Sequence, residues 1–359
     1  MSSQHSQRVL LISRFLATAM TSSSNSIFYV YTPRWRDNAA GIKALHLLCD
    51  AINQKGGSAW LVFSNPSLKD SGINHKLNTP VLTRRILKKH QTQSLIPSVV
   101  YTETIAGNPL HANRVIRWLL NYPGNLGGKT EFSDKEWVIS YSGKISKSYK
   151  LSSDVLYLPI VDPNELPKGL SKSPGLNVVY AGKYRAFVGK PEIPEHLSYV
   201  EIYRDGKKRQ PRKKVLDLLG RAEVLYLWEN SSIAVEAMLM DTPCMFIENS
   251  FLGDLIAEDE LGIDGSGFGF SIESFEKAKK TLPIFHERYS KARANFWNQL
   301  DGVLTRNETQ WNDTGISQIK LPVYMYSSIK HKVSLFGGVV KQQGLVTAFR
   351  VIKKFVKPS

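Results

Sequence analysis

The segment most informative for the fold is residues 224–247, VLYLWENSSIAVEAMLMDTPCMFI, in a chain of 359 residues. An uninterrupted apolar run leads into the polar turn Glu229-Asn230-Ser231-Ser232, then a short helical pattern, and then a second apolar run. Apolar runs without alternation are typical of strands buried on both faces of a parallel sheet. Because parallel neighbours need a crossover connection, the segment predicts one strand–helix–strand unit of an α/β domain.

The same pattern recurs on both sides of this unit. Strands are predicted at residues 27–31, 58–63, 98–102, 137–141, 155–160, 177–181, 198–203, 223–228 and 244–247, and helices at 38–55, 110–121, 212–220 and 233–240. The sequence therefore predicts an α/β fold with two Rossmann-like, doubly wound parallel-sheet domains. Two such sheets face each other across a cleft, and ligands bind at the carboxyl ends of the strands.

Composition shifts suggest the domain boundaries. We expect a flexible lead-in over residues 1–26, an N-terminal domain over 27–162, a Pro- and Gly-containing linker over 163–175, a C-terminal domain over 176–320, and a basic tail over 321–359. The tail has no Asp or Glu and seven Lys or Arg. Its residues 339–357 predict a basic amphipathic helix, which suits either an anionic membrane surface or docking on the protein body.

Charge and composition narrow the function classes. The formal net charge is +16, which would attract nucleic acid, an anionic membrane or phosphate-bearing substrates. Two cysteines, Cys49 and Cys244, are too few for a disulfide framework or a cysteine zinc site and predict buried free thiols. No apolar stretch is long enough for a membrane span, so we expect a cytoplasmic protein, peripheral on the inner face of the plasma membrane if the tail binds lipid.

Residues 204–214, RDGKKRQPRKK, hold seven basic residues among eleven. A solvated basic loop and a surface for anionic lipid or nucleic acid are both compatible with this run. It has no aromatic residue for base stacking. No phosphate-binding P-loop, nucleophile elbow or metal-spaced His pair is present, so we expect no metal site and no cofactor.

The turn and helix after residue 228 carry the clearest binding chemistry. A helix start offers unpaired N–H groups to a phosphate, and Ser231 and Ser232 stand there. Glu236 follows about one turn later, where it could accept hydrogen bonds from ribose hydroxyls. The alternative is a capping serine and a glutamate that is favourable near the helix dipole.

At this point the sequence resembles the nucleotide-sugar site of GT-B glycosyltransferases, retaining bacterial polysaccharide enzymes in particular. Glu236-Ala237-Met238 and Thr242-Pro243 match the pattern, with Asp241 in place of its usual glycine. The position of the first motif glutamate holds Trp228, and Glu229 stands one place later. The resemblance implies that the C-terminal domain binds the nucleotide sugar, with the ribose on Glu236, and that the N-terminal domain presents the acceptor.

Three further segments fit the same resemblance. Gly182-Lys183, with Arg185, follows the first strand of the C-terminal domain, where the family places a basic contact to the donor diphosphate. The loop after the first strand, residues 32–41, stands where the family has a glycine-containing loop near the phosphates. A Glu…Gly-Asn-Pro-Leu element spans residues 103–110. The candidate catalytic residues are Asp37, Glu103 and His111; the donor-binding residues are Gly182, Lys183, Arg185, Glu229, Ser231, Ser232 and Glu236; the acceptor or phosphate contacts are Asn38, Gly41 and Asn108.

The resemblance implies a metal-independent glycosyltransferase. Its donor would be a nucleotide sugar, and its acceptor a bacterial surface polysaccharide, such as a lipopolysaccharide, or a lipid-linked glycan precursor of the cell envelope. Because Trp228 departs from the motif, the sequence also fits a catalytically degenerate partner protein that binds nucleotide or glycan. The charge of +16 leaves a nucleic-acid-binding protein as a third hypothesis.

Overall fold

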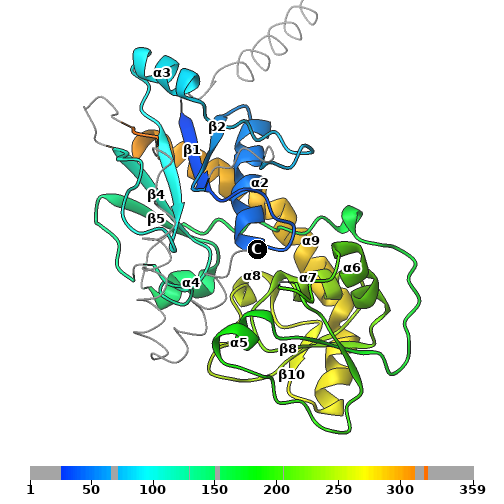
Figure 1. The fold of residues 1–359 in the computed structure, drawn as a ribbon. Helices are drawn as coiled ribbons and strands as arrows, with labels where there is room; N and C mark the ends of the chain where they lie inside the picture. Colours follow the sequence, from blue (N-terminus) through cyan, green and yellow to red (C-terminus); the bar gives the residue numbers. More distant parts are fainter. Residues whose placement is uncertain are drawn as a thin grey trace, which may run out of the picture.

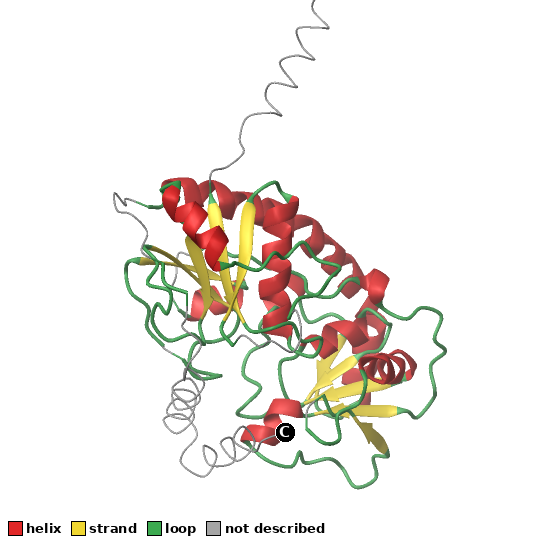
Figure 2. Ribbon diagram, turned by 45° about the horizontal axis from the view of Figure 1, so that its top comes forward, coloured by secondary structure: helices red, strands yellow, loops and turns green. Residues whose placement is uncertain are grey.

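The structure is a computed structural model that describes residues 26–65, 72–128, 130–149, 154–204, 206–311 and 319–321. It contains two α/β domains, each built on a five-stranded sheet whose strands all pair in parallel (Figures 1 and 2). The predicted fold class, two parallel-sheet domains, is confirmed. The predicted lead-in before Ser26 and the predicted amphipathic tail beyond Leu321 lie outside the described residues.

The N-terminal sheet has the strand order β2-β1-β3-β4-β5. Its strands are β1 (Ile27–Thr32), β2 (Ser58–Phe63), β3 (Ser98–Thr102), β4 (Arg114–Leu119) and β5 (Glu136–Ser140). Helix α2 (Ala40–Gln54) buries Leu45, Leu48 and Ile52 against one face. Helix α3 (Arg84–Thr92) contributes Leu87 to the apolar cluster of the opposite face. A short helix, α4 (Gly143–Ser148), follows β5.

The C-terminal sheet has the strand order β10-β9-β8-β6-β7. Its strands are β6 (Asn177–Tyr180), β7 (Tyr199–Glu201), β8 (Val224–Leu227), β9 (Cys244–Phe246) and β10 (Ser266–Phe268). The shorter helices around it are α5 (Gly182–Phe187), α6 (Arg212–Arg221), α7 (Ser232–Met238) and α8 (Glu258–Leu261). A 3-10 turn, η1 (Pro163–Glu165), starts the predicted linker.

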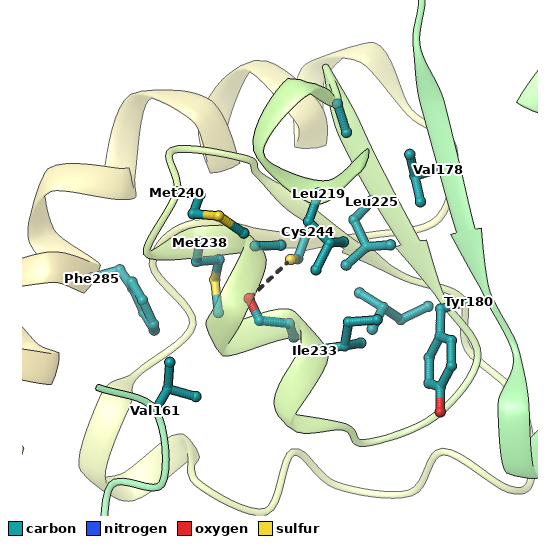
Figure 3. Close-up of a cluster of buried hydrophobic side chains, with 14 of the residues drawn as sticks. Val161, Val178, Tyr180, Leu219, Leu225, Ile233, Met238, Met240, Cys244 and Phe285 are labelled. Carbon is teal, nitrogen blue, oxygen red and sulfur yellow. Dashed lines mark hydrogen bonds between the residues drawn. The ribbon is translucent and has the colours of Figure 1, made fainter. Parts of the chain in front are cut away.

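The core of the C-terminal domain lies between the sheet, α7 and the last helix, α9 (Ile272–Thr309). Figure 3 shows Phe285 of α9 and Val161, which lies just before the linker, beside Met238 of α7. Cys244 is buried in this cluster and donates a hydrogen bond to the Ala234 carbonyl oxygen at 3.5 Å. Both cysteines are buried free thiols, as predicted.

Helix α9 joins the two domains (Figure 1). Its first half buries Phe285 and Tyr289 in the C-terminal core, and its second half buries Phe296 and Leu300 in the N-terminal core. The second half of α9 therefore belongs spatially to the N-terminal domain, although the sequence boundary placed residues 176–320 in the C-terminal one. The chain therefore passes between the two domains twice, once through the linker and once through α9.

Two local predictions are wrong. The helix expected at residues 110–121 is strand β4, because Val115, Ile116 and Trp118 are buried in the sheet and the buried Arg117 between them pairs with Glu136 of the next strand. The strand expected at residues 155–160 is reduced to an isolated bridge between Ser140 and Val155. None of the helices in the described part of the chain combines the length and apolar character needed to span a bilayer.

Candidate active site between the two domains

Glu103 follows β3 directly, so it lies at the carboxyl end of the N-terminal sheet. Its side chain is buried, and Oε2 accepts a hydrogen bond from the Leu120 N–H, just beyond β4, at 2.9 Å. Burial raises the pKa of Glu103 to about 7, while backbone N–H groups and the Lys183 ammonium pull it down. Lys183 belongs to the C-terminal domain, so the charge of the predicted donor cation acts on a predicted catalytic carboxylate across the domain boundary.

Glu229 lies at the carboxyl end of β8 and is also buried. Its Oε2 accepts hydrogen bonds from the backbone N–H groups of Lys183 and, at 3.0 Å, of Tyr184. Burial raises the pKa of Glu229, and the Lys183 charge, the two N–H groups and the Arg204 charge lower it. Glu229 therefore ties the end of β8 to the start of α5, and its carboxylate neutralises that helix start.

The residues beside Lys183 have structural contacts of their own. A Cβ on Gly182 would lie 2.5 Å from the Tyr180 hydroxyl, so any larger residue there would require the Tyr180 side chain to move. Arg185 donates from Nε and Nη2 to Glu201 Oε1, at 2.9 Å and 2.6 Å. Arg185 is thus held within its own domain, whereas the side chain of Lys183 is exposed.

Glu236 lies in the second turn of α7 and is 1% exposed. Its Oε1 accepts a hydrogen bond from Nη1 of Arg212, the first residue of α6, at 2.8 Å. Ser231 caps α7 by accepting from the Ile233 N–H at 3.5 Å, and Ser232 starts the helix. The capping interpretation of Ser231 is therefore observed, and Arg212 is a partner of Glu236 that sequence reasoning missed.

The loop between β1 and α2 contacts the C-terminal domain. Asn38 donates from Nδ2 to the Arg204 carbonyl oxygen at 2.8 Å. Asp37 is exposed and accepts from Trp35 Nε1 at 2.8 Å. Gly41 is exposed, and a Cβ there would make only an ordinary contact, at 3.6 Å, with a leucine side chain. The structure brings this predicted loop to the domain boundary, but packing does not require its glycine.

Asn108 and His111 lie away from Glu103. Because β4 runs parallel to β3, with Arg114 opposite Ser98, the chain returns to the amino edge of the sheet before β4 begins. His111 is exposed and precedes β4 by three residues. The Asn108 amide is used inside this connection: Oδ1 accepts from the Tyr101 hydroxyl and the Ala112 N–H, and Nδ2 donates to the Ala112 carbonyl oxygen. The predicted roles of His111 in catalysis and Asn108 in ligand contact stay predictions, although the structure places both residues in the connection that leads to strand β4 and not at the start of a helix.

A group of cations gathers at the domain boundary beside Glu236. Lys43, in the first turn of α2, is buried. Burial lowers the pKa of its ammonium group first; the charges of Arg212 and Arg204 lower it further, and those of Glu236 and Glu165 raise it. Two cations of the basic run 204–214, Arg204 and Arg212, thus act on Lys43 at the domain boundary. The run is therefore not entirely a solvated loop. The sequence pointed to Lys43 only through its position, in the first turn of the helix that follows the first strand.

A cavity of about 870 Å³ opens next to this cation group. It lies between α2, residues 158–162 and α9, and Lys43, Arg212, Trp35, Asp37 and Trp297 are among the residues that line it. A volume of this size suits a small-molecule ligand. In the described ranges, no group of three or more His, Cys, Asp and Glu side chains is placed to hold a metal ion.

A second set of contacts joins the domains through α4 and α8. The Gly143 N–H donates to Glu260 Oε1 at 2.8 Å. Lys144 pairs with Glu258 at 2.9 Å. Lys147 pairs with Asp259 at 2.8 Å. Each of three consecutive acidic residues of α8 therefore has a partner in α4.

Comparison with known proteins gives likeness in fold. No family model matches the chain, and no curated protein matches it. Among solved structures, the glycosyltransferase SnogD from Streptomyces nogalater is similar over 79% of this chain and 99% of its own, with 11% identity and a TM-score of 0.44. WaaG, a glycosyltransferase involved in lipopolysaccharide biosynthesis, is similar over 77% and 98%, with 11% identity and a TM-score of 0.43. T4 phage BGT in complex with UDP-glucose is similar over 78% and 98%, with 12% identity and a TM-score of 0.42.

Proposed function

We propose that the chain is a nucleotide-sugar-dependent glycosyltransferase that works without a metal ion. The observation that carries the proposal is the buried carboxylate of Glu103 at the carboxyl end of β3, on which the Lys183 charge acts from the other domain. Glu103 has a pKa of about 7, which suits a group that exchanges a proton at neutral pH. Lys183 supplies a fixed positive charge, which a departing nucleoside diphosphate needs when no metal ion neutralises it.

In the proposed reaction, Glu103 accepts the proton of the acceptor hydroxyl. The hydroxyl oxygen forms a bond to the anomeric carbon of the donor sugar, and the bond from that carbon to the diphosphate oxygen breaks. Lys183 stabilises the negative charge that develops on the leaving diphosphate. Glu236 holds the ribose, and its buried ion pair with Arg212 keeps its carboxylate in place.

We further propose that the acceptor is a bacterial surface polysaccharide or a lipid-linked glycan precursor. The motif resemblance around Glu103 and Glu236 supports this acceptor class, and so does the positive charge of the chain. The cavity of about 870 Å³ offers room for part of such a glycan beside the loop that carries Asp37. Attachment to an anionic membrane surface through residues 339–357 belongs to the same proposal.

The test is a turnover assay with purified protein and a panel of UDP-, GDP-, dTDP- and CMP-sugars. Release of nucleotide is measured with lipid-linked glycan or polysaccharide acceptor, and without it. Glu103→Gln is expected to lower kcat by about 10²–10⁴-fold because general base catalysis is lost. Glu131→Gln, an exposed glutamate on the same domain, is the matched control and should leave kcat unchanged. Acceptor-dependent turnover that survives Glu103→Gln would contradict the proposed mechanism.

A second function, binding without catalysis, is favoured by one observation. Trp228 is buried at the place of the first motif glutamate, and Glu229 is used as an anchor for α5. A degenerate partner protein would bind one nucleotide of the panel but release no sugar with any acceptor. Calorimetry of the same panel, run beside the turnover assay, distinguishes the two functions.

A further inference from the structure

Two buried cations meet at the boundary of the two domains. Lys43 in α2 and Arg204, three residues after β7, are each 9% exposed. They belong to different domains, and the Asn38 hydrogen bond to the Arg204 carbonyl oxygen holds their segments together at 2.8 Å. The Arg204 charge acts on the Lys43 ammonium, so the two positive charges lie within electrostatic reach of each other.

Among the described residues, neither cation has an ion-pair partner. In the part of the chain that the structure describes, the Lys43 ammonium and the Arg204 guanidinium form no hydrogen bond or ion pair. The nearby carboxylates are engaged elsewhere: Glu236 with Arg212, and Glu229 with the start of α5. Burial of an unpaired charge is unfavourable, and a facing charge of the same sign adds to the cost. Such an arrangement is expected where an anion binds.

We propose that Lys43 and Arg204 bind the diphosphate group of a nucleotide ligand, with Arg212 completing the site from α6. A guanidinium donates two parallel hydrogen bonds to phosphate oxygens, and an ammonium adds a compact charge. Glu236 acts on Lys43 and Arg204 acts on Glu229, so the cation pair lies within electrostatic reach of both glutamates. With the ribose at Glu236, the diphosphate would lie at this pair.

The proposed site is divided between the domains, so ligand binding should affect how the two domains are arranged. A diphosphate that contacts both Lys43 and Arg204 stabilises the arrangement in which the two domains approach. A ligand that binds one arrangement better shifts the population toward it. The identity of the ligand as a sugar donor rests on the proposed function, but the binding of a phosphate group does not.

The test is calorimetric titration of the full chain with pyrophosphate, the nucleoside diphosphates and the free nucleosides. Pyrophosphate and one diphosphate are expected to bind, and the nucleosides are not. Lys43→Met and Arg204→Met should each weaken binding by about 30-fold or more, because one charge of the anion site is lost. Lys55→Met, at the end of the same helix and paired with Asp301, and Lys213→Met, exposed in α6, are matched controls and should change the affinity less than twofold.

Thermal unfolding without ligand separates a binding role from a structural one. Lys43→Met should raise Tm, because it removes a buried charge that has no partner. Absence of pyrophosphate binding, binding by both variants as tight as by the wild type, or a lower Tm for folded Lys43→Met would each overturn the inference. Pyrophosphate binding without sugar transfer would leave the site standing and refute only the glycosyltransferase proposal. Transfer that is unaffected by both variants would refute only the site.

Discussion

Replacement of Glu103 by Gln tests the electrostatics of the site through protein stability. Glu103 is buried at the end of β3, and its pKa is about 7, compared with an ordinary value of 4.5. Desolvation of the charged form is the main cause. Glutamine is nearly isosteric with the protonated acid and carries no charge at any pH. The variant therefore removes the titration and keeps an oxygen that can accept from the Leu120 N–H.

The sign and magnitude follow from proton linkage. A raised pKa means that the folded state holds the proton more tightly than the unfolded state. The contribution of protonated Glu103 to the unfolding free energy is therefore fully present below pH 4.5. It is lost as the pH rises to about 7, at about 1.4 kcal/mol per pH unit. Between pH 5 and pH 8, the wild type should lose about 2–3 kcal/mol of unfolding free energy relative to Glu103→Gln. Other raised carboxyls, such as Glu260, titrate in both proteins and cancel in this difference.

The assay is urea unfolding of both proteins at half-unit pH steps, followed by tryptophan fluorescence. Glu131→Gln is the control, because Glu131 is exposed and its difference from the wild type should not vary with pH. A Glu103→Gln difference that is the same at pH 5 and pH 8 would refute the reasoning. It would mean that Glu103 is ionised in the folded protein at no unusual cost, and its suitability as a base at neutral pH would lose its physical support.

Three further predictions concern the framework of the site. Leu300→Ala removes a fully buried side chain from the part of α9 on the N-terminal core, so urea unfolding should show a loss of about 2–5 kcal/mol, and an unchanged midpoint would contradict the packing. Gly182→Ala should lower Tm because its Cβ would lie 2.5 Å from the Tyr180 hydroxyl; Tyr180→Phe should recover part of the loss, whereas strictly additive losses would argue against the contact. Lys147→Glu breaks the ion pair with Asp259, so small-angle scattering at low salt should show a wider particle, and Asp259→Lys in the same chain should reverse it.

The parallel-sheet architecture was predictable because buried strands leave a local signal. Residues 224–247 form β8, α7 and β9 as expected, since each apolar run is just long enough for one strand and the polar turn between them holds a capping serine. Strand β3 was also predicted with its observed bounds. These features depend on neighbours in sequence, and neighbours in sequence are what a pattern contains.

The errors arose where distant contacts override the local pattern. In the sequence, Arg117 fits the polar face of a helix. In the structure it lies in β4 and forms a bidentate ion pair with Glu136 of the next strand. That pairing reverses the expected course of the chain and moves His111 to the amino edge of the sheet. Lys43 and Arg204 gave only weak signals, since each looks like a surface cation until α2 and the segment after β7 are brought together.

The displaced glutamate of the motif connects these observations. At position 228 the side chain is a tryptophan that packs with Tyr226 in an apolar cluster, so no carboxylate is available there. Glu229, one place later, reaches the backbone N–H groups of α5 and neutralises them. The start of α5 then has no charge to spare for a phosphate, and side chains must supply it. Because the buried Arg204 acts on both Glu229 and Lys43, the proposed diphosphate site would account for the departure from the motif and for the unpaired cations together.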